Sequence, residues 1–385
     1  MKDETRVTHG GTDIDLDIKT VNPPIYRAST VLFPNTESLK DFSRPYVYGR
    51  RGTPTTRALE TALAALEGGE KTVLLPSGLA AIACALLAVV KSGDHVLVTD
   101  GVYSPNRHFC DRFLSRMGVS TTYYEPGLGA DIADLIQPTT RVVFAESPAS
   151  LTFEVQDLPA IAAAAHARGA LVLIDNTWAS PFYFKPLAYG ADISIQSATK
   201  YIGGHSDLML GTITANGDTA RAVYDTHGML GQHVSPDDVY LGLRGLRSLG
   251  VRMPRHYENG LAVARWLQKR PEVDRVLHPA LEGAAGHALW KRDFTGASGT
   301  FGVILKPVAK KAVAAMLDGL SLFSLGYSFG GYESLIILSD PGSQRSVTKW
   351  TEAPTLRLHI GLEDPGDLIA DLEEGFGRFA QAAQS

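Results

Sequence analysis

Residues 171–207, LVLIDNTWASPFYFKPLAYGADISIQSATKYIGGHSD, contain two short apolar runs that each end in a polar turn. Their lengths and flanking residues predict β-strands at LVLID (171–175) and DISIQ (192–196). Similar runs occur earlier in the chain, at 72–75, 95–99 and 141–146. Helical stretches separate these runs, and strands of this kind between helices predict a mostly parallel sheet covered on both faces. The expected fold class is α/β.

The length of 385 residues favours two domains. The α/β pattern begins with a helix at TTRALETALAALEGG, which Thr55 or Thr56 can cap, and ends near Arg247. The rest contains a helical stretch and a few strands, near 299–305, 335–338 and 355–360, and a final amphipathic helix from about 367 to 380. We expect an N-terminal arm over residues 1–54, an α/β domain over 55–247 and a smaller α+β domain over 248–385.

The composition is typical of a soluble globular chain. Hydrophobic residues make up 44% and charged residues 20%, and the 41 acidic and 36 basic residues are well mixed, which disfavours nucleic acid as a partner. The polar start MKDETRVTHGG does not look like a secretory signal, and the longest apolar run, 79–90, is too short to span a membrane. The two cysteines lack the spacing of a metal site or a disulfide framework. We therefore expect no metal, no membrane and a cytoplasmic location.

Two of the strand ends carry polar residues suited to binding a charged ligand. In open parallel sheets, ligands bind outside the carboxyl ends of the strands. LLPSGLAA (74–81) predicts a strand, a turn and a helix whose first N–H groups can bind a phosphate, although such turns are also common without a ligand. Asp175 follows four apolar residues, so its carboxylate can pair with a protonated ring nitrogen or simply anchor the loop.

The third polar segment, SATKYIGG (197–204), contains a candidate catalytic lysine. Ser197 and Thr199 can direct two hydroxyls to a phosphate while Lys200 directs its amine to an aldehyde. A lysine that is desolvated near other cations has a lowered pKa, which supplies the neutral amine that forms an imine. The alternative interpretation is a solvated loop lysine, which the neighbouring hydroxyls and the Gly-Gly pair disfavour.

In combination, these segments resemble a known family. The resemblance covers about residues 20 to 376 and rests on PIYRAST, YVYGRRGTPT, PSGLAA, DNTWASP, SATKYIGGHSD, GLRGLRSL and TLRLHIGLED. The chain is similar to the Cys/Met-metabolism group of fold-type I pyridoxal-phosphate enzymes. This group includes cystathionine β-lyases, γ-lyases and γ-synthases, methionine γ-lyases and homoserine sulfhydrylases.

The resemblance implies a pyridoxal 5′-phosphate cofactor on Lys200, held as a Schiff base. It implies that Asp175 binds the pyridinium nitrogen and that Tyr103 stacks on the ring and assists proton transfer. It further implies that Tyr48 and Arg50 reach the phosphate of the neighbouring subunit, which makes a dimer obligatory and agrees with the family's usual homotetramer. The cofactor-binding residues implied are Tyr48, Arg50, Ser77, Gly78, Leu79, Tyr103, Asp175, Ser197, Thr199 and Lys200.

The resemblance also implies which substrate groups the chain binds. Arg357 in TLRLHIG matches the arginine that forks onto the substrate carboxylate. Tyr327 replaces the glutamate of the γ-enzymes, and Ser150 replaces their asparagine after the central strand; both changes favour a bacterial β-lyase. The substrate-binding residues implied are Tyr48, Tyr327, Ser328, Phe329 and Arg357.

Two positions leave the preferred thioether open. Phe329 stands where the β-lyases have tryptophan, which keeps an aromatic wall without the indole N–H. His108 stands where some relatives have an acidic residue that meets the distal ammonium of the substrate, and a histidine would bind that group less well.

The expected activity is α,β-elimination of L-cystathionine to homocysteine, pyruvate and ammonia, in methionine biosynthesis. The alternatives within the family are a γ-lyase, a γ-synthase, a methionine γ-lyase and a β-lyase for another cysteine S-conjugate. A cofactor-free Schiff-base aldolase would leave the phosphate turn and Asp175 unexplained. A dinucleotide-dependent oxidoreductase would need G-x-G-x-x-G after the first strand, which LLPSGLAAIA lacks. A non-catalytic scaffold would have no reason to keep these residues together.

Overall fold

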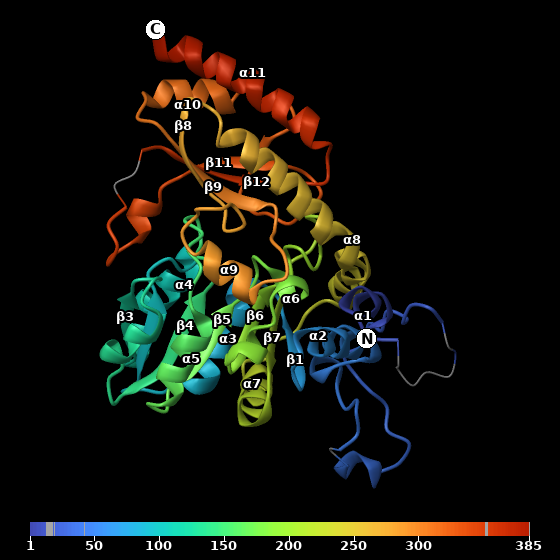
Figure 1. Ribbon diagram of the computed structural model, residues 1–385. Helices are drawn as coiled ribbons and strands as arrows, with labels where there is room; N and C mark the ends of the chain where they lie inside the picture. Colours follow the sequence, from blue (N-terminus) through green and yellow to red (C-terminus); the bar gives the residue numbers. More distant parts are fainter. Residues whose placement is uncertain (13–17, 19, 42, 351–352, 385) are drawn as a thin grey trace.

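The structure is a computed structural model that describes residues 1–12, 18, 20–41, 43–350 and 353–384. Two sheets, one above the other in Figure 1, form its two main layers. The helices are α1 Asp3–His9, α2 Pro54–Glu67, α3 Gly78–Val89, α4 Ser104–Phe109, α5 Leu158–His166, α6 Ser180–Tyr183, α7 Gly217–Met229, α8 Pro236–Leu267, α9 His287–Asp293, α10 Lys310–Leu317 and α11 Pro365–Gln384.

The larger sheet has the strand order β1-β7-β6-β5-β4-β2-β3. Strands β2 to β6 run parallel to one another, whereas β7 is antiparallel to both β1 and β6. Its strands are β1 Lys71–Leu75, β2 His95–Thr99, β3 Ser120–Tyr124, β4 Thr140–Glu146, β5 Leu171–Asp175, β6 Ile193–Ser197 and β7 Gly211–Ala215. The predicted α/β class and mostly parallel sheet are confirmed, while β3 and β7 were not predicted.

Helices cover both faces of this sheet because its strands are apolar on both sides. On β4, Val143 and Ala145 pack into the core that contains α2, α5 and α8, whereas Val142 and Phe144 pack into the core that contains α3 and α7. Successive residues of a strand point to opposite faces, so a continuous apolar run supplies both cores. The carboxyl ends of the parallel strands then meet at one edge, where polar residues can surround a ligand.

The smaller sheet has the order β10-β11-β12-β9-β8 and is mostly antiparallel. Its strands are β8 Val273–Leu277, β9 Thr300–Leu305, β10 Ser324–Leu325, β11 Leu335–Ser339 and β12 Thr355–His359. Helices α10 and α11 pack on it, and the long helix α8 runs from the larger layer to the smaller one (Figure 1). The loops of the smaller sheet therefore face the polar edge of the larger layer (Figure 1).

The first 54 residues differ in part from the extended arm that we expected. Helix α1 packs on α8 and α2, because Val7 is buried (1% exposed), Asp3 pairs with Lys185 at 2.6 Å and Arg247 donates to the Gly10 carbonyl oxygen. The cap of α2 is Thr53 rather than Thr55 or Thr56, because Pro54 occupies the first helical position and moves the cap one residue earlier.

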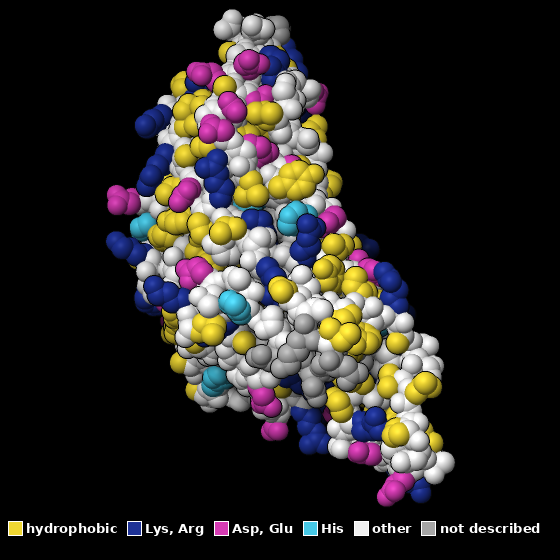
Figure 2. Space-filling view, turned by 90° about the vertical axis from the view of Figure 1, so that its right-hand side faces the viewer, with side chains coloured by type: hydrophobic (Ala, Val, Ile, Leu, Met, Phe, Trp, Pro, Cys, Tyr) yellow, Lys and Arg dark blue, Asp and Glu magenta, His cyan; other side chains and the backbone are white. Residues whose placement is uncertain are grey.

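On the face shown in Figure 2, basic and acidic side chains are interspersed over the residues that the structure describes. This agrees with the mixed charges of the sequence. In the described part of the chain, the helices are either too short or too polar to cross a membrane.

Candidate active site

Lys200 lies in the loop between β6 and β7, at the edge where the two layers meet. Its Nζ donates a hydrogen bond to the Ser328 hydroxyl at 2.6 Å and lies 5.1 Å from the centre of the Phe329 ring. Burial lowers the pKa of Lys200 to about 8; the positive charge of Arg357 lowers it further and the negative charge of Asp175 opposes this. A substantial fraction of the amine is therefore neutral near physiological pH, as a nucleophile or base requires.

Asp175 is the last residue of β5 and lies at the same edge. Its side chain is buried, and its Oδ1 accepts a hydrogen bond of 2.9 Å from the Thr177 N–H. Burial raises the pKa of Asp175, while the hydrogen bonds from Thr177 and the charge of Lys200 lower it. A buried carboxylate at this place can hold a protonated ring nitrogen, because both charges then find a partner.

Glu146 is a second carboxyl group at this edge and was not among the predicted site residues. It ends β4 directly opposite Asp175 in the strand register. Burial, followed by the negative charge of Asp175, raises the pKa of Glu146 well above its usual value. Its Oε2 accepts a hydrogen bond of 2.7 Å from the Tyr103 N–H. The signal was present, because RVVFAE ends an apolar strand in a carboxylate as LVLID does.

The turn after β1 and the start of the Lys200 loop are in direct contact. A Cβ on Gly78 would lie 2.6 Å from Ser197 Cβ, and one on Gly211 would lie 2.1 Å from the Ser77 carbonyl oxygen. Ser77 caps the 12-residue helix α3 and accepts a hydrogen bond from Ala80 N–H. The absent side chain at position 78 thus leaves helix N–H groups and the Ser197 hydroxyl together, in a cradle that fits a phosphate.

Leu79 and Thr199, the other two residues predicted to bind the phosphate, differ in their hydrogen bonding. Leu79, partly exposed, follows Gly78 in the first turn of α3, where backbone N–H groups have no helical partner. The Thr199 hydroxyl is engaged by the backbone of Leu210, from whose N–H it accepts a bond of 2.9 Å and to whose carbonyl it donates one of 3.2 Å. Only the longer of these two bonds would have to be exchanged for a phosphate oxygen.

Arg357 enters the same region from β12 of the smaller sheet. Its Nη2 donates to the Ser328 carbonyl oxygen at 2.9 Å, and burial lowers the pKa of Arg357 to about 10, so the guanidinium stays charged. Tyr327, in the same turn, is 89% exposed, and Tyr103 is 43% exposed. Burial, and then the charges of Asp175 and Glu146, raise the pKa of Tyr103, so its phenol keeps its proton.

Tyr48 and Arg50 lie against other parts of their own chain. Tyr48 is 46% exposed and pairs with Thr30, and Arg50 donates to the Gly228 carbonyl oxygen of α7 at 2.9 Å. In Figure 1 the segment that carries them extends away from the layer boundary. Of the two positions that leave the preferred thioether open, Phe329 faces Lys200, whereas His108 is an exposed residue of α4.

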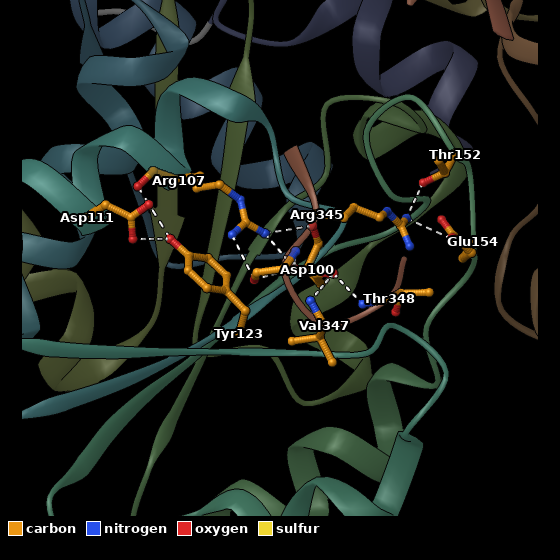
Figure 3. Close-up of polar contacts among 10 residues, drawn as sticks. Asp100, Arg107, Asp111, Tyr123, Thr152, Glu154, Arg345, Val347 and Thr348 are labelled. Atoms are coloured by element: carbon orange, nitrogen blue, oxygen red, sulfur yellow. Dashed lines mark hydrogen bonds and ion pairs between the residues drawn. The ribbon is translucent and has the colours of Figure 1, made fainter. Parts of the chain in front are cut away.

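A loop of the smaller sheet, residues 345–348, docks against Asp100, the residue that follows β2; we call it the strap (Figure 3). Asp100 accepts hydrogen bonds from the backbone N–H groups of Ser346 (2.9 Å), Val347 (3.0 Å) and Thr348 (2.9 Å). Asp100 also pairs at 2.7 Å with Arg107 of α4, the helix that Tyr103 precedes. Arg345 of the strap pairs with Glu154 at 2.7 Å. The strap thus ties the two layers together next to the site.

The described residues therefore fit an aromatic aldehyde that carries a phosphate and a ring nitrogen. Lys200 supplies the amine, Asp175 the carboxylate for the nitrogen, and the turn at Ser77 and Gly78 the phosphate cradle. Arg357 is left to bind a carboxylate at the side of Lys200 that faces the smaller sheet. Such a set of groups suits chemistry at the α-carbon of an amino acid.

Comparisons with known proteins agree with this fit. The family model described as "Cys/Met metabolism PLP-dependent enzyme" matches residues 4–377. The chain is 50% identical over 376 residues to a "Putative cystathionine beta-lyase" of Rhizobium johnstonii, covering 97% of this chain and 95% of the relative. It is 46% identical over 387 residues to "Cystathionine beta-lyase MetC" of Escherichia coli, covering 97% and 98%. A crystal structure of metB from Corynebacterium glutamicum superposes with a TM-score of 0.92, at 31% identity and 98% coverage of both chains.

Proposed function

Because the chain belongs to the Cys/Met metabolism PLP-dependent enzyme family, we propose that it is a carbon–sulfur lyase that cleaves L-cystathionine to homocysteine, pyruvate and ammonia. The observation that carries the proposal is the buried Lys200 amine, whose pKa is lowered to about 8 between Arg357 and Asp175. An amine that exchanges its proton near neutral pH can serve first as a base and then as an acid.

Each group has a role in this reaction. When bound, pyridoxal phosphate supplies an electron sink beside the substrate α-carbon. Arg357 binds the substrate carboxylate through its two parallel N–H groups. Lys200 removes the α-proton and returns a proton to the departing sulfur, so that the Cβ–S bond breaks as the thiol is released. Asp175 would pair with the ring nitrogen of the bound cofactor and favour its protonated form, and Tyr103 would lie against the ring and assist proton transfer.

The polar turn at Ser77, Gly78 and Leu79, with Ser197 and Thr199, would hold the phosphate. Tyr48 and Arg50 would complete the site of a neighbouring subunit; the exposure of Tyr48, which leaves its side chain open to a partner, supports this. This proposal includes a homotetramer built as a dimer of dimers and a cytoplasmic enzyme. It also includes the division into an arm (1–54), a cofactor domain (55–247) and a C-terminal domain (248–385).

The bond that is cleaved follows from the turn at 327–329, which faces Lys200. Tyr327 and Phe329 present aromatic groups there, and no acidic side chain occurs between them. Exposure of Tyr327 leaves it free to contact the thioether. Tyr327, which stands where the γ-enzymes have a glutamate, supports β-elimination rather than γ-elimination.

Product analysis tests the proposal. The enzyme loaded with pyridoxal phosphate should convert cystathionine to pyruvate and homocysteine; release of 2-oxobutyrate and cysteine would show a γ-lyase instead. Little turnover of cystathionine with rapid pyruvate release from another cysteine S-conjugate would show a different β-lyase. Lys200→Ala should lose the visible absorbance of the lysine-bound cofactor and turnover, whereas Lys306→Ala, which changes an exposed lysine, should lose neither.

A further inference from the structure

His359 lies directly behind the turn that carries Ser328 and Phe329. It is the last residue of β12, two positions after Arg357, and its side chain is 1% exposed. Its Nε2 lies 3.0 Å from the Gly330 nitrogen and 3.1 Å from the Gly331 carbonyl oxygen. The same ring nitrogen is therefore within hydrogen-bond distance of two consecutive backbone groups of the turn.

The other ring nitrogen connects His359 to the Lys200 loop. Nδ1 lies 3.1 Å from the Thr300 hydroxyl, which lies 3.0 Å from the hydroxyl of Tyr201. Nδ1 is also 3.4 Å from the Gly330 nitrogen, a longer approach than that of Nε2. His359 thus joins the turn, β9 and the residue after Lys200 in one buried network.

The turn has no room to move toward Lys200 without losing this geometry. Gly330 has a φ of +84°, and a Cβ there would lie 2.7 Å from the Tyr201 nitrogen and 3.1 Å from Lys200 Cα. The turn therefore rests on the Lys200 backbone and is held by His359 through its N–H and carbonyl groups. Movement of the turn would separate the Ser328 hydroxyl from Lys200 Nζ and the Ser328 carbonyl from Arg357.

The imidazole of His359 is suited to holding the turn because it stays neutral. Burial, and then the positive charges around it, hold the pKa of His359 well below its usual value; the groups that face it are His256, Arg357 and Lys200. A neutral imidazole has one donor and one acceptor nitrogen, so Nε2 either accepts from Gly330 or donates to Gly331 while Nδ1 serves Thr300. Either tautomer holds the turn.

We propose that His359 is a positioning residue: through Nε2 it fixes the turn so that Ser328 stays within reach of Lys200 and Arg357. The inference rests on the proposed lyase function, since it explains how the amine is held for proton transfer. The alternative is that His359 only fills a buried space in the smaller layer. A positioning role predicts that Nε2 in particular matters for turnover, whereas a space-filling role predicts no difference between the two ring nitrogens.

A pair of amide variants separates the two nitrogens. The side-chain amide of His359→Gln reaches the position of Nε2, whereas that of His359→Asn reaches the position of Nδ1. We expect His359→Gln to keep kcat within roughly threefold, and His359→Asn to lower it about 100-fold with a smaller change in KM, since a displacement near 1 Å can cost that much. His278→Gln, a buried histidine of the same layer, controls for polar replacement in the core.

Two further readouts separate positioning from stability. The thermal midpoints of the two variants should fall by similar amounts, whereas the pH at which the visible absorbance of the bound cofactor titrates should shift only in His359→Asn. Equal kcat in both variants, or kcat losses that follow the thermal midpoints, would overturn the proposal. If His359→Asn does not fold, Gly330→Ala replaces it, because it displaces the turn while His359 stays; an unchanged kcat there would also contradict the proposal.

The outcome is distinguishable from a failure of the proposed function. If the wild-type enzyme releases no pyruvate from cystathionine, the lyase assignment fails, but the absorbance titration still tests whether His359 positions the groups around Lys200. If the wild-type enzyme is active and the variants behave alike, only the role of His359 fails.

Discussion

The Lys200 amine and the Ser328 hydroxyl lie 2.6 Å apart although 128 positions separate them in the chain. The first belongs to a loop of the larger sheet and the second to a turn before β11 of the smaller sheet. A hydrogen bond to a charged group contributes about 1.5–3 kcal/mol, which is enough to orient a flexible lysine. The contact therefore makes the catalytic amine depend on both layers.

Removal of this hydroxyl should slow the reaction. We expect Ser328→Ala to lower kcat by roughly 10- to 100-fold, as the loss of a charged hydrogen bond predicts. KM should change less, because Arg357 bonds the backbone carbonyl of Ser328, which remains. Steady-state pyruvate release checks this. Ser206→Ala, which removes a nearby hydroxyl that bonds Glu333, is the matched control, and an equal loss there would argue against the role of Ser328.

Replacement of Arg357 by lysine should weaken substrate binding more than it slows turnover. Lysine keeps the positive charge but cannot form two parallel hydrogen bonds to a carboxylate. We expect Arg357→Lys to raise KM for cystathionine by roughly 10- to 100-fold, in line with about 1.5–3 kcal/mol for a charged hydrogen bond. Absorbance of the bound cofactor should be retained. An unchanged KM would show that the substrate carboxylate binds elsewhere.

Loss of the Asp100 charge should release the strap. Asp100→Asn removes an acceptor for the N–H groups of residues 346–348 and the partner of Arg107. Trypsin should then cut after Arg345, whose side chain is only 3% exposed in the intact strap, at least several-fold faster. Mass spectrometry of the fragments measures this rate.

The control for the strap experiment is Asp111→Asn. Asp111 bonds the Tyr123 hydroxyl on the same side of the molecule without contacting the strap (Figure 3). In this variant, trypsin should cut after Arg345 at the same rate as in the wild type. A strap that is equally resistant in the Asp100 variant would mean that the pair of Arg345 and Glu154 holds it without Asp100.

Glu67 should make stability fall as the pH rises. It is 1% exposed and accepts hydrogen bonds from Ser194 and Gln196, and burial raises its pKa from 4.5 to about 7. Between these values the native state binds a proton that the unfolded state has lost, so the free energy of unfolding decreases with pH through this window.

Glu67→Gln removes this titration and keeps a donor and an acceptor for Ser194 and Gln196. Between pH 5 and pH 8, the free energy of unfolding of the variant should increase relative to that of the wild type by on the order of 3 kcal/mol. This value is set by the change in the pKa of Glu67. Urea midpoints of the cofactor-loaded enzyme at both pH values measure the difference. Parallel pH dependence in the two proteins would show that Glu67 stays ionised.

The sequence predicted those parts of the site that lie in one continuous segment. Lys200, Ser197 and Asp175 follow apolar strands, and ligands of open parallel sheets bind at the carboxyl ends of such strands, which predicts that the three residues lie together. The family, the fold class and the cofactor expected from the resemblance are confirmed. The roles of the individual residues and the domain bounds stay predictions that the variants above can test.

The remaining features depend on contacts between distant segments, which local patterns do not contain. Strand β7 was not predicted because its sequence, GTITA, is short and alternates polar with apolar residues. Its place between β1 and β6 is fixed only by pairing within the sheet. The carboxylate of Glu146 at the end of RVVFAE could have been predicted, but its pairing with Asp175, 29 positions away, arises only through the strand register. The network of His359 likewise joins segments from three parts of the chain.

Strand β7 also sets the order in which the pocket can be made during synthesis. The edge strand β1, which leads into the phosphate turn, joins the sheet through β7, and Lys200 lies in the connection that precedes β7. The ribosome must therefore release the chain past residue 215 before the turn and the lysine can meet. Until then, β1 lacks its strand partner in the larger sheet, and Gly211 is not yet in place against the Ser77 carbonyl of the phosphate turn.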